Sequence, residues 1–480
     1  MSAKITFYGG AGTVTGANFL LDADSTPSMN SGQAGSPQAG AQKILIDCGI
    51  LQRETVCDIA NRAPFQYDVK TIDALIVTHA HADHIGRIPR LAREGFRGAI
   101  HSTGATKDLA ALMFADALRV MEEDALKRGC EVLYEAQDIE KTLSLWITHE
   151  YHEQFETHEA SPRGFQSETS GITVEFLDAG HVLGSALVKL TRHGRTIVFT
   201  GDIGNSPEPL LKDTEFPAGA DYLVMESVYG DRMHDGREER REKLRQCVED
   251  TRARKGVLLI PSFSLERTQL LLFELNVMME EETLAPIPVY LDSPLAIEIT
   301  DVFRKYRHLL NPAAQEHFSA HGDPFTFRSL KLTRGVSESR AIHAAPSPKI
   351  IIAGAGMSHG GRIPVHEKYY LGDKHATILF VGYQVPGSLG RRIEDGEKRV
   401  EIDGEHIRIY AKRETLTGYS GHADREQLLT FVERAGEKLE RVFVTMGEPH
   451  SSMFLAQRIQ DFLGIEAVVP QLGQTFTLEW

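Results

Sequence analysis

One short segment constrains this chain more than any other: residues 78–84 read Thr-His-Ala-His-Ala-Asp-His. The segment follows an apolar run typical of a strand, and side chains alternate along a strand, so His79 and His81 lie on one side. Asp83 and His84 then fall at the start of the next expected helix. Imidazole and carboxylate together suit zinc, and less exclusively iron or manganese. The segment therefore predicts a loop that aims side chains at one or two metal ions.

Two further candidate ligands also follow expected strand ends. His181 comes directly after Gly180, and Asp202 comes directly after Gly201. Glycine permits tight turns that leave the next side chain exposed at a sheet edge. An isolated histidine is usually an ordinary surface or core residue. A cluster of four candidates followed by Gly-His and Gly-Asp favours a metal site instead.

The bulk composition narrows the class of protein. A chain of 480 residues is too long for one hydrophobic core, so two domains or more are expected. The net charge of −15 argues against a protein that coats nucleic acid by general attraction, although metal ions could add positive charge locally. No apolar run is long enough for a bilayer, so no membrane partner is expected. The cysteines match no C-x-x-C pattern, which indicates a reducing cytoplasm and metal ligands that are nitrogen and oxygen: Cys48, Cys57, Cys130 and Cys247.

The pattern of expected secondary structure changes near residue 255. Before it, short stretches rich in β-formers alternate with turns. After it, apolar strands such as 257–261 and 289–291 alternate with helical periodicity such as 266–279. This alternation predicts a parallel sheet covered on both faces.

The whole pattern resembles the metallo-β-lactamase fold and, more specifically, the β-CASP nucleases, which include ribonuclease J and the cleavage-and-polyadenylation nuclease. Asp47, in Ile-Asp-Cys-Gly, resembles the first motif of the fold. Glu226 resembles motif A of the β-CASP nucleases, and His422, in Ser-Gly-His-Ala-Asp, resembles motif B. Further matching stretches cover nearly the whole chain in the expected order: 261–263, 267–269, 292–296, 356–362 and 381–384. The length is most similar to that of the compact prokaryotic members.

The resemblance implies an α/β protein with two domains. Residues 1–231 and 412–480 would form an αββα metallo-β-lactamase sandwich, and residues 232–411 would form an inserted α/β β-CASP domain. It also implies a zinc-dependent ribonuclease that hydrolyses RNA phosphodiester bonds. The expected partner is RNA, most readily single-stranded RNA, and some members of the family form homodimers.

The resemblance further implies a role for each candidate side chain. His79, His81 and His181 would hold a first zinc ion, Asp83 and His84 a second, and Asp202 would bridge the two. Asp47 would support the ligand loop. A metal-bound hydroxide would attack phosphorus. The implied catalytic residues are Asp83, Asp202, Glu226 and His422, with His422 as general acid and Glu226 holding its other nitrogen.

One position departs from the family pattern. Motif C usually supplies a histidine to the second metal, but the matching position holds Met446, whose thioether is a poor ligand there. His450, four residues on, could replace it, could bind a substrate phosphate, or could be solvated. The second zinc is therefore in doubt. Two alternatives stay open: an RNA-binding scaffold with impaired catalysis, and a metallo-hydrolase that acts on DNA or a small ester.

Two glycine-rich segments suit phosphate binding. The first, 354–362, contains Ser358 and Arg362, and the second, 387–392, contains Arg391. Backbone amides and arginine at such turns bind phosphate. These residues could form a basic cleft between the domains, or they could be part of an ordinary solvated surface.

Overall fold

A computed structural model describes residues 2–23, 42–51, 59–157, 171–234, 236–358, 360–385 and 387–480. Contacts divide the chain into two compact units. Unit 1 comprises 1–206, 213–233 and 422–480, and unit 2 comprises 207–212 and 234–421. The domain bounds at 231/232 and 411/412 stay a sequence-based prediction. Among the described helices, none has the length and apolar character needed to cross a bilayer.

Unit 1 is built on two seven-stranded sheets. The first has the order β22 (Thr475–Glu479), β1 (Ser2–Gly9), β2 (Asn18–Ala23), β3 (Gln42–Ile46), β4 (Ala74–Ile76), β5 (Ala99–Thr103), β6 (Trp146–His149). The second has the order β21 (Glu466–Val468), β20 (Arg441–Val444), β11 (Tyr222–Met225), β10 (Arg195–Phe199), β9 (Ala186–Arg192), β8 (Thr173–Asp178), β7 (Gln154–Glu156).

The two sheets of unit 1 pack face to face through aromatic side chains. The ring centroids of Phe7 and Phe443 lie 5.4 Å apart, and those of Phe19 and Phe199 lie 6.2 Å apart. Burying large rings between two apolar faces is a strongly favourable part of the folding free energy. This buried layer fixes where the strand ends, and hence the loops that follow them, come together.

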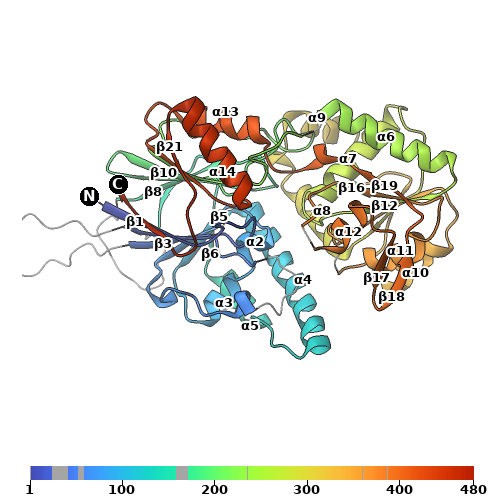
Figure 1. The fold of residues 1–480 in the computed structure, drawn as a ribbon, viewed down its shortest axis with the longest axis horizontal. Helices are drawn as coiled ribbons and strands as arrows, with labels where there is room; N and C mark the ends of the chain where they lie inside the picture. The colour runs from blue at the N-terminus through green and yellow to red at the C-terminus, as the bar shows by residue number, and fades with distance from the viewer. Residues whose placement is uncertain are drawn as a thin grey trace, which may run out of the picture. The chain divides into compact units, whose positions relative to one another are not determined.

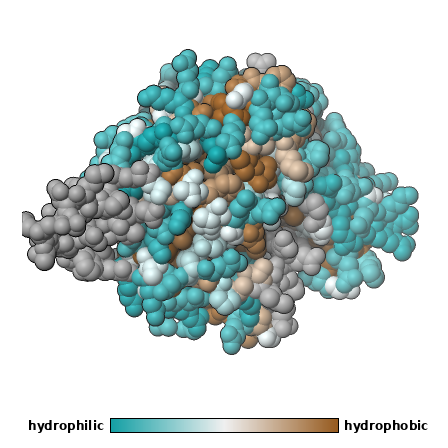
Figure 2. All heavy atoms as spheres, turned by 60° about the vertical axis from the view of Figure 1, so that its left-hand side comes forward, coloured by the Kyte–Doolittle hydropathy of each residue, from teal (hydrophilic) through white to brown (hydrophobic). Residues whose placement is uncertain are grey.

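Helices cover the outer faces of both sheets, which gives the expected αββα arrangement (Figure 1). On the first sheet the helices are α1 (Ile59–Arg62), η1 (Val69–Thr71), α2 (Ala82–Ile85), α3 (Ile88–Arg93), α4 (Gly104–Arg128) and α5 (Ala136–Ser144). On the second they are α13 (Arg425–Ala435), α14 (Pro449–Arg458) and η4 (Ile459–Leu463). Figure 2 shows a surface that is mainly hydrophilic, with apolar side chains gathered in patches.

Unit 2 contains the parallel sheet that the alternation of strands and helices after residue 255 predicted. Its order is β14 (Leu330–Leu332), β13 (Val289–Asp292), β15 (Lys349–Ala353), β12 (Val257–Pro261), β16 (Thr377–Phe380), β19 (Lys412–Thr415). All five pairings are parallel. A hairpin joins β17 (Arg399–Ile402) to β18 (Glu405–Arg408). The helices are α6 (Arg237–Ala253), α7 (Arg267–Glu280), α8 (Pro294–Lys305), η2 (Arg307–Leu309), α9 (Pro312–Ala320), α10 (Val336–Ala344), α11 (Ile363–Tyr370), α12 (Leu389–Glu394) and η3 (Thr417–Tyr419).

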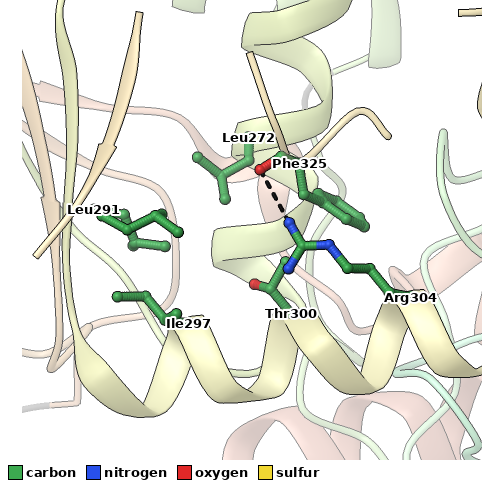
Figure 3. A pocket seen from close by; sticks show the side chains of 7 residues that line it. Leu272, Leu291, Ile297, Thr300, Arg304 and Phe325 are labelled. Atoms are coloured by element: carbon green, nitrogen blue, oxygen red, sulfur yellow. Dashed lines mark hydrogen bonds between the residues drawn. The ribbon is translucent and has the colours of Figure 1, made fainter. Parts of the chain in front are cut away.

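A small pocket in unit 2 carries no catalytic constellation. Leu272, Leu291 and Ile297 line it together with Arg304, whose guanidinium donates to the Phe325 carbonyl at 3.2 Å (Figure 3). That guanidinium also pairs with a carboxylate outside the pocket. The pocket is therefore lined mainly by apolar side chains, and the Arg304 guanidinium at its edge already has hydrogen-bond and ion-pair partners.

The cysteines differ from one another. Cys48 and Cys247 are free and buried. Cys130 is disulfide-bonded, which departs from the expectation of reduced cysteines, and Cys57 lies outside the described residues.

Candidate metal centre

The predicted ligand loop is held in place by Asp47, which follows β3 as the loop follows the neighbouring β4. The Asp47 carboxylate is fully buried and accepts hydrogen bonds from the Thr78 amide and hydroxyl, both at 2.8 Å. Its Oδ2 also lies 2.7 Å from Nδ1 of His84. This contact orients the imidazole so that its Nε2 faces the site. Asp47 therefore supports the loop, as the resemblance implied.

Four side chains from three loops converge beyond the strand ends: His79, His81, His181 and Asp202. His81 Nδ1 lies 3.1 Å from His79 Nε2 and 3.2 Å from His181 Nε2. Asp202 Oδ2 lies 3.4 Å from Nε2 of both His79 and His181. A tetrahedral zinc ion with bonds of about 2.0–2.1 Å separates its ligand atoms by about 3.3–3.4 Å. The four separations around this ring of atoms are thus close to those between neighbouring ligands of one zinc ion, and all four atoms lie within 4.8 Å of one another.

The protonation states of these groups also suit a cation. Burial lowers the pKa of His79, His81 and His181, and the neighbouring imidazoles lower it further. Burial alone would raise the pKa of Asp202, but the charge of His84 and the hydrogen bond with His79 outweigh it and hold the pKa well below its usual range. Neutral imidazoles and an ionised carboxylate are the forms that bind metal.

Two buried atoms at this site have no hydrogen-bond partner among the described residues. They are His84 Nε2 and Asp202 Oδ1, which lie 3.4 Å apart as an ion pair without a well-formed hydrogen bond. A metal cation bound by both atoms would replace the charge of His84 and satisfy both. Asp83 lies close enough for its pKa to respond to both residues, and its burial raises that pKa. The donor set therefore fits a metal among His79, His81, His181 and Asp202, and offers Asp83, His84 and Asp202 toward a second position.

Glu226 and His422 form a second cluster that shares Asp202 with the first. Glu226 follows β11, is fully buried, and accepts from the Ile203 amide at 2.6 Å. His422 Nδ1 lies 3.2 Å from Glu226 Oε1. Burial alone would lower the pKa of His422, but the charge and hydrogen bond of Glu226 outweigh it and raise the pKa to about 9. Glu226 therefore favours the charged form of His422 beside the cluster.

Comparisons with known proteins agree with this geometry. Three family profiles match: the metallo-beta-lactamase superfamily at residues 38–262, the Beta-Casp domain at 268–393, and the Zn-dependent metallo-hydrolase RNA specificity domain at 406–470. Ribonuclease TTHA0252 of Thermus thermophilus is 34% identical over 98% of this chain and 99% of its own length. The chain belongs to the β-CASP family of metallo-β-lactamase-fold hydrolases.

Two more distant relatives extend the comparison. Transcription termination factor FttA of Methanosarcina mazei is 30% identical over 96% of this chain and 70% of its own length. A protein of unknown function from Enterococcus faecalis has a solved structure that covers all of both chains, with 12% identity and a TM-score of 0.53. This last likeness concerns the fold alone.

Met446, at the position that resembles β-CASP motif C, is a core residue. It is 2% exposed, belongs to the core between the two sheets, and its sulfur lies against Gly10. His450 does not join the ligand cluster: its side chain is 79% exposed and its Nδ1 lies 3.3 Å from Asp231 Oδ2. Neither residue completes a second metal position in this structure.

The three predicted substrate residues lie in unit 2 and are engaged there. The Ser358 hydroxyl donates to Glu367 Oε1 at 2.5 Å. Arg362 pairs with buried Asp292 at 2.5 Å, and Arg391 pairs with Asp395 at 2.8 Å. Their role in phosphate binding stays a prediction, and the contacts describe a stabilising role for Arg362.

Sequence reasoning missed two residues of this β-CASP site. The Thr78 hydroxyl lies 3.1 Å from His79 Nδ1 as well as donating to Asp47, so it sets the ring orientation. Its position directly before the first histidine was the available signal. Tyr229, whose ring centroid lies 6.2 Å from that of His422, belongs to the stretch that resembles motif A, but that resemblance assigned it no role.

Proposed function

We propose that this protein is a zinc-dependent ribonuclease that hydrolyses phosphodiester bonds in single-stranded RNA. One observation carries the proposal: four candidate ligand atoms within 4.8 Å of one another lie beside a Glu226–His422 pair that shares Asp202 with them. Two findings support RNA as the substrate: a relative that is named as a ribonuclease and matches over 99% of its length, and the match to an RNA specificity profile. RNA is favoured over DNA on these grounds.

Zinc binding is proposed to be tight at one position and weak at a second. His79, His81, His181 and Asp202 would hold the tight ion. The second position has Asp83, His84 and a shared Asp202 but neither Met446 nor His450, so it has fewer protein ligands than the four of a closed site. A bound zinc ion supplies Lewis acidity, which lowers the pKa of water and neutralises phosphate charge.

His422 is proposed to donate the proton that the leaving oxygen requires. Its Nδ1 faces the Glu226 carboxylate, so the proton for the leaving oxygen comes from Nε2. Glu226 keeps the imidazole charged and holds its orientation, as a carboxylate partner does for catalytic histidines. Glu226 itself is fixed by the Ile203 amide, which restricts movement of the pair.

Cleavage of a labelled single-stranded RNA, with a DNA strand of the same sequence beside it, tests the proposal. The wild-type protein should cut the RNA, and a chelator should abolish cutting. His422→Ala should slow cleavage by about 10²–10⁴-fold while zinc content stays the same. His406→Ala, an exposed histidine of β18, is the matched control and should cut normally.

Elemental analysis provides a separate test of the metal count. After dialysis, about one zinc per chain is expected, with a second retained only in excess zinc. Two ions that survive dialysis would show that the loss of the motif C histidine is compensated. Normal cleavage by His422→Ala would remove His422 from the mechanism, and cleavage that a chelator cannot stop would overturn the metal proposal.

A further inference from the structure

A row of alternating rings and cations follows the last long helix of unit 1. His450, Phe454 and Arg458 are four residues apart on α14, and Phe462 continues the row in η4, so all four share one face. The rings of His450 and Phe454 lie 6.4 Å apart at 25°. The Arg458 guanidinium carbon lies 5.0 Å from the Phe454 centroid and 5.1 Å from that of Phe462.

The neighbouring helix α13 adds a second cation to this row. Arg425 places its guanidinium carbon 6.0 Å from the Phe454 centroid, and α13 lies beside α14 (Figure 1). The two ends of the row are well exposed: the His450 side chain by 79% and Phe462 by 66%. We call these five residues the α14 row: Arg425, His450, Phe454, Arg458 and Phe462.

The α14 row is continuous with the surroundings of His422. His450 Nδ1 lies 3.3 Å from Asp231 Oδ2, and Asp231 pairs with Arg232 at 2.8 Å. The Arg232 guanidinium carbon lies 5.7 Å from the Tyr229 ring, and that ring lies 6.2 Å from the His422 ring. All these residues belong to unit 1. A strand leaving His422 can therefore pass from side chain to side chain onto α14.

We propose that the α14 row binds single-stranded RNA and guides the strand to or from His422; this inference rests on the proposed ribonuclease function. Rings interleaved with cations are the platform on which unpaired bases stack while phosphates are neutralised. His450 and Phe462 are exposed and Phe454 is partly exposed, while Arg425 also pairs with Glu426 at 2.9 Å. In the part of the chain that the structure describes, Arg458 has no carboxylate partner, so its charge is available.

Length-dependent binding tests this proposal in the full-length chain. The double variant R458A/F462A would be compared with wild type for cleavage of RNA oligonucleotides of about 4 and about 20 nucleotides. We expect KM for the long RNA to rise about 10–100-fold, because about 1–3 kcal/mol is lost for each unstacked base. The kcat value and the cleavage of the short RNA should stay unchanged, and the salt dependence of KM should weaken by about one phosphate contact.

The matched control is R119A/L126A, which removes an exposed arginine and an exposed leucine from α4. It should leave cleavage of both RNAs as in wild type. If R458A/F462A behaves like this control while wild type cuts RNA, the α14 row proposal is overturned and the ribonuclease proposal stands. If the double variant changes only the oligomeric state in light scattering, the row is a self-association surface and the RNA proposal is equally overturned. If wild type neither binds nor cuts RNA, it is the underlying function that fails.

Discussion

The two units of this protein each bury a cluster of histidine and aspartate, and the clusters differ in how their atoms are satisfied. In unit 2, Asp292 accepts from Thr333 and Arg362 through Oδ1 and from Ser339 and His366 through Oδ2, at 2.5–2.7 Å. Every acceptor faces a donor. Burial alone would raise the pKa of Asp292, but these hydrogen bonds outweigh it and lower the pKa.

The unit 1 cluster has the same residue types, but its acceptor atoms are not all paired with donors. Imidazole nitrogens of His79, His81 and His181 face one another, and Asp202 Oδ1 has no hydrogen-bond partner among the described residues. A buried network in which every acceptor has a donor stabilises the fold by itself. A cluster in which several acceptor atoms face one another is stable only when a cation lies between them. Residue type alone therefore does not separate a metal site from a structural network, but the pairing of donors with acceptors does.

The largest expected effect comes from Asp202→Asn, which breaks the unit 1 cluster with almost no change of shape. Zinc content should fall, and RNA cleavage should drop by ~10³-fold, because the ligand charge is lost. The wild-type melting temperature should fall when zinc is removed, since binding well above Kd contributes about 4 kcal/mol, whereas the variant should not respond to chelator. A variant that retains zinc and its thermal response would show that Asp202 is not a ligand.

The same substitution in unit 2, Asp292→Asn, should have the opposite signature. It leaves Arg362 and His366 without their full partner, so the free energy of unfolding should fall by about 2–4 kcal/mol. Zinc per chain should stay the same, and urea unfolding of metal-free and zinc-loaded protein should show the same loss. Loss of zinc without loss of stability would reverse the assignment of the two clusters.

The candidate ligands of unit 1 follow strand ends in recognisable Gly-His, Gly-Asp and His-x-His patterns, so the sequence could select His79, His81, His181 and Asp202, which the structure places together. The parallel sheet of unit 2 was predicted from strand–helix alternation, whereas the αββα fold of unit 1 was implied by the family resemblance. The contacts of Arg362 could not be predicted, because its partner Asp292 lies seventy residues away at the end of β13, whereas Arg362 precedes α11. The direction of Met446 also needed the structure, since one sequence position can face either the core or the metal site.

The smallest expected effect concerns Glu367 in unit 2, which sharpens the comparison because it is a buried carboxyl that is only half satisfied. Ser358 donates to Oε1, while Oε2 has no hydrogen-bond partner among the described residues. Burial raises the pKa of Glu367 to about 8, so its unpaired oxygen is accommodated by a proton where that of Asp202 is proposed to be accommodated by zinc.

This difference predicts how stability depends on pH. The unfolded chain releases the Glu367 proton near pH 4.5 and the folded chain only near pH 8, so stability is lost as pH rises between the two values. Glu367→Gln cannot ionise and should lack this part of the slope, which amounts to about 1–3 kcal/mol after allowance for relaxation. Urea unfolding of both proteins at pH 5, 6.5 and 8 measures the difference. Histidine titration contributes equally to the pH dependence of both proteins, so it cancels in the comparison. If the two proteins gave parallel curves of stability against pH, Glu367 would be ionised in the folded protein. Its second carboxylate oxygen would then be buried with neither a proton nor a cation.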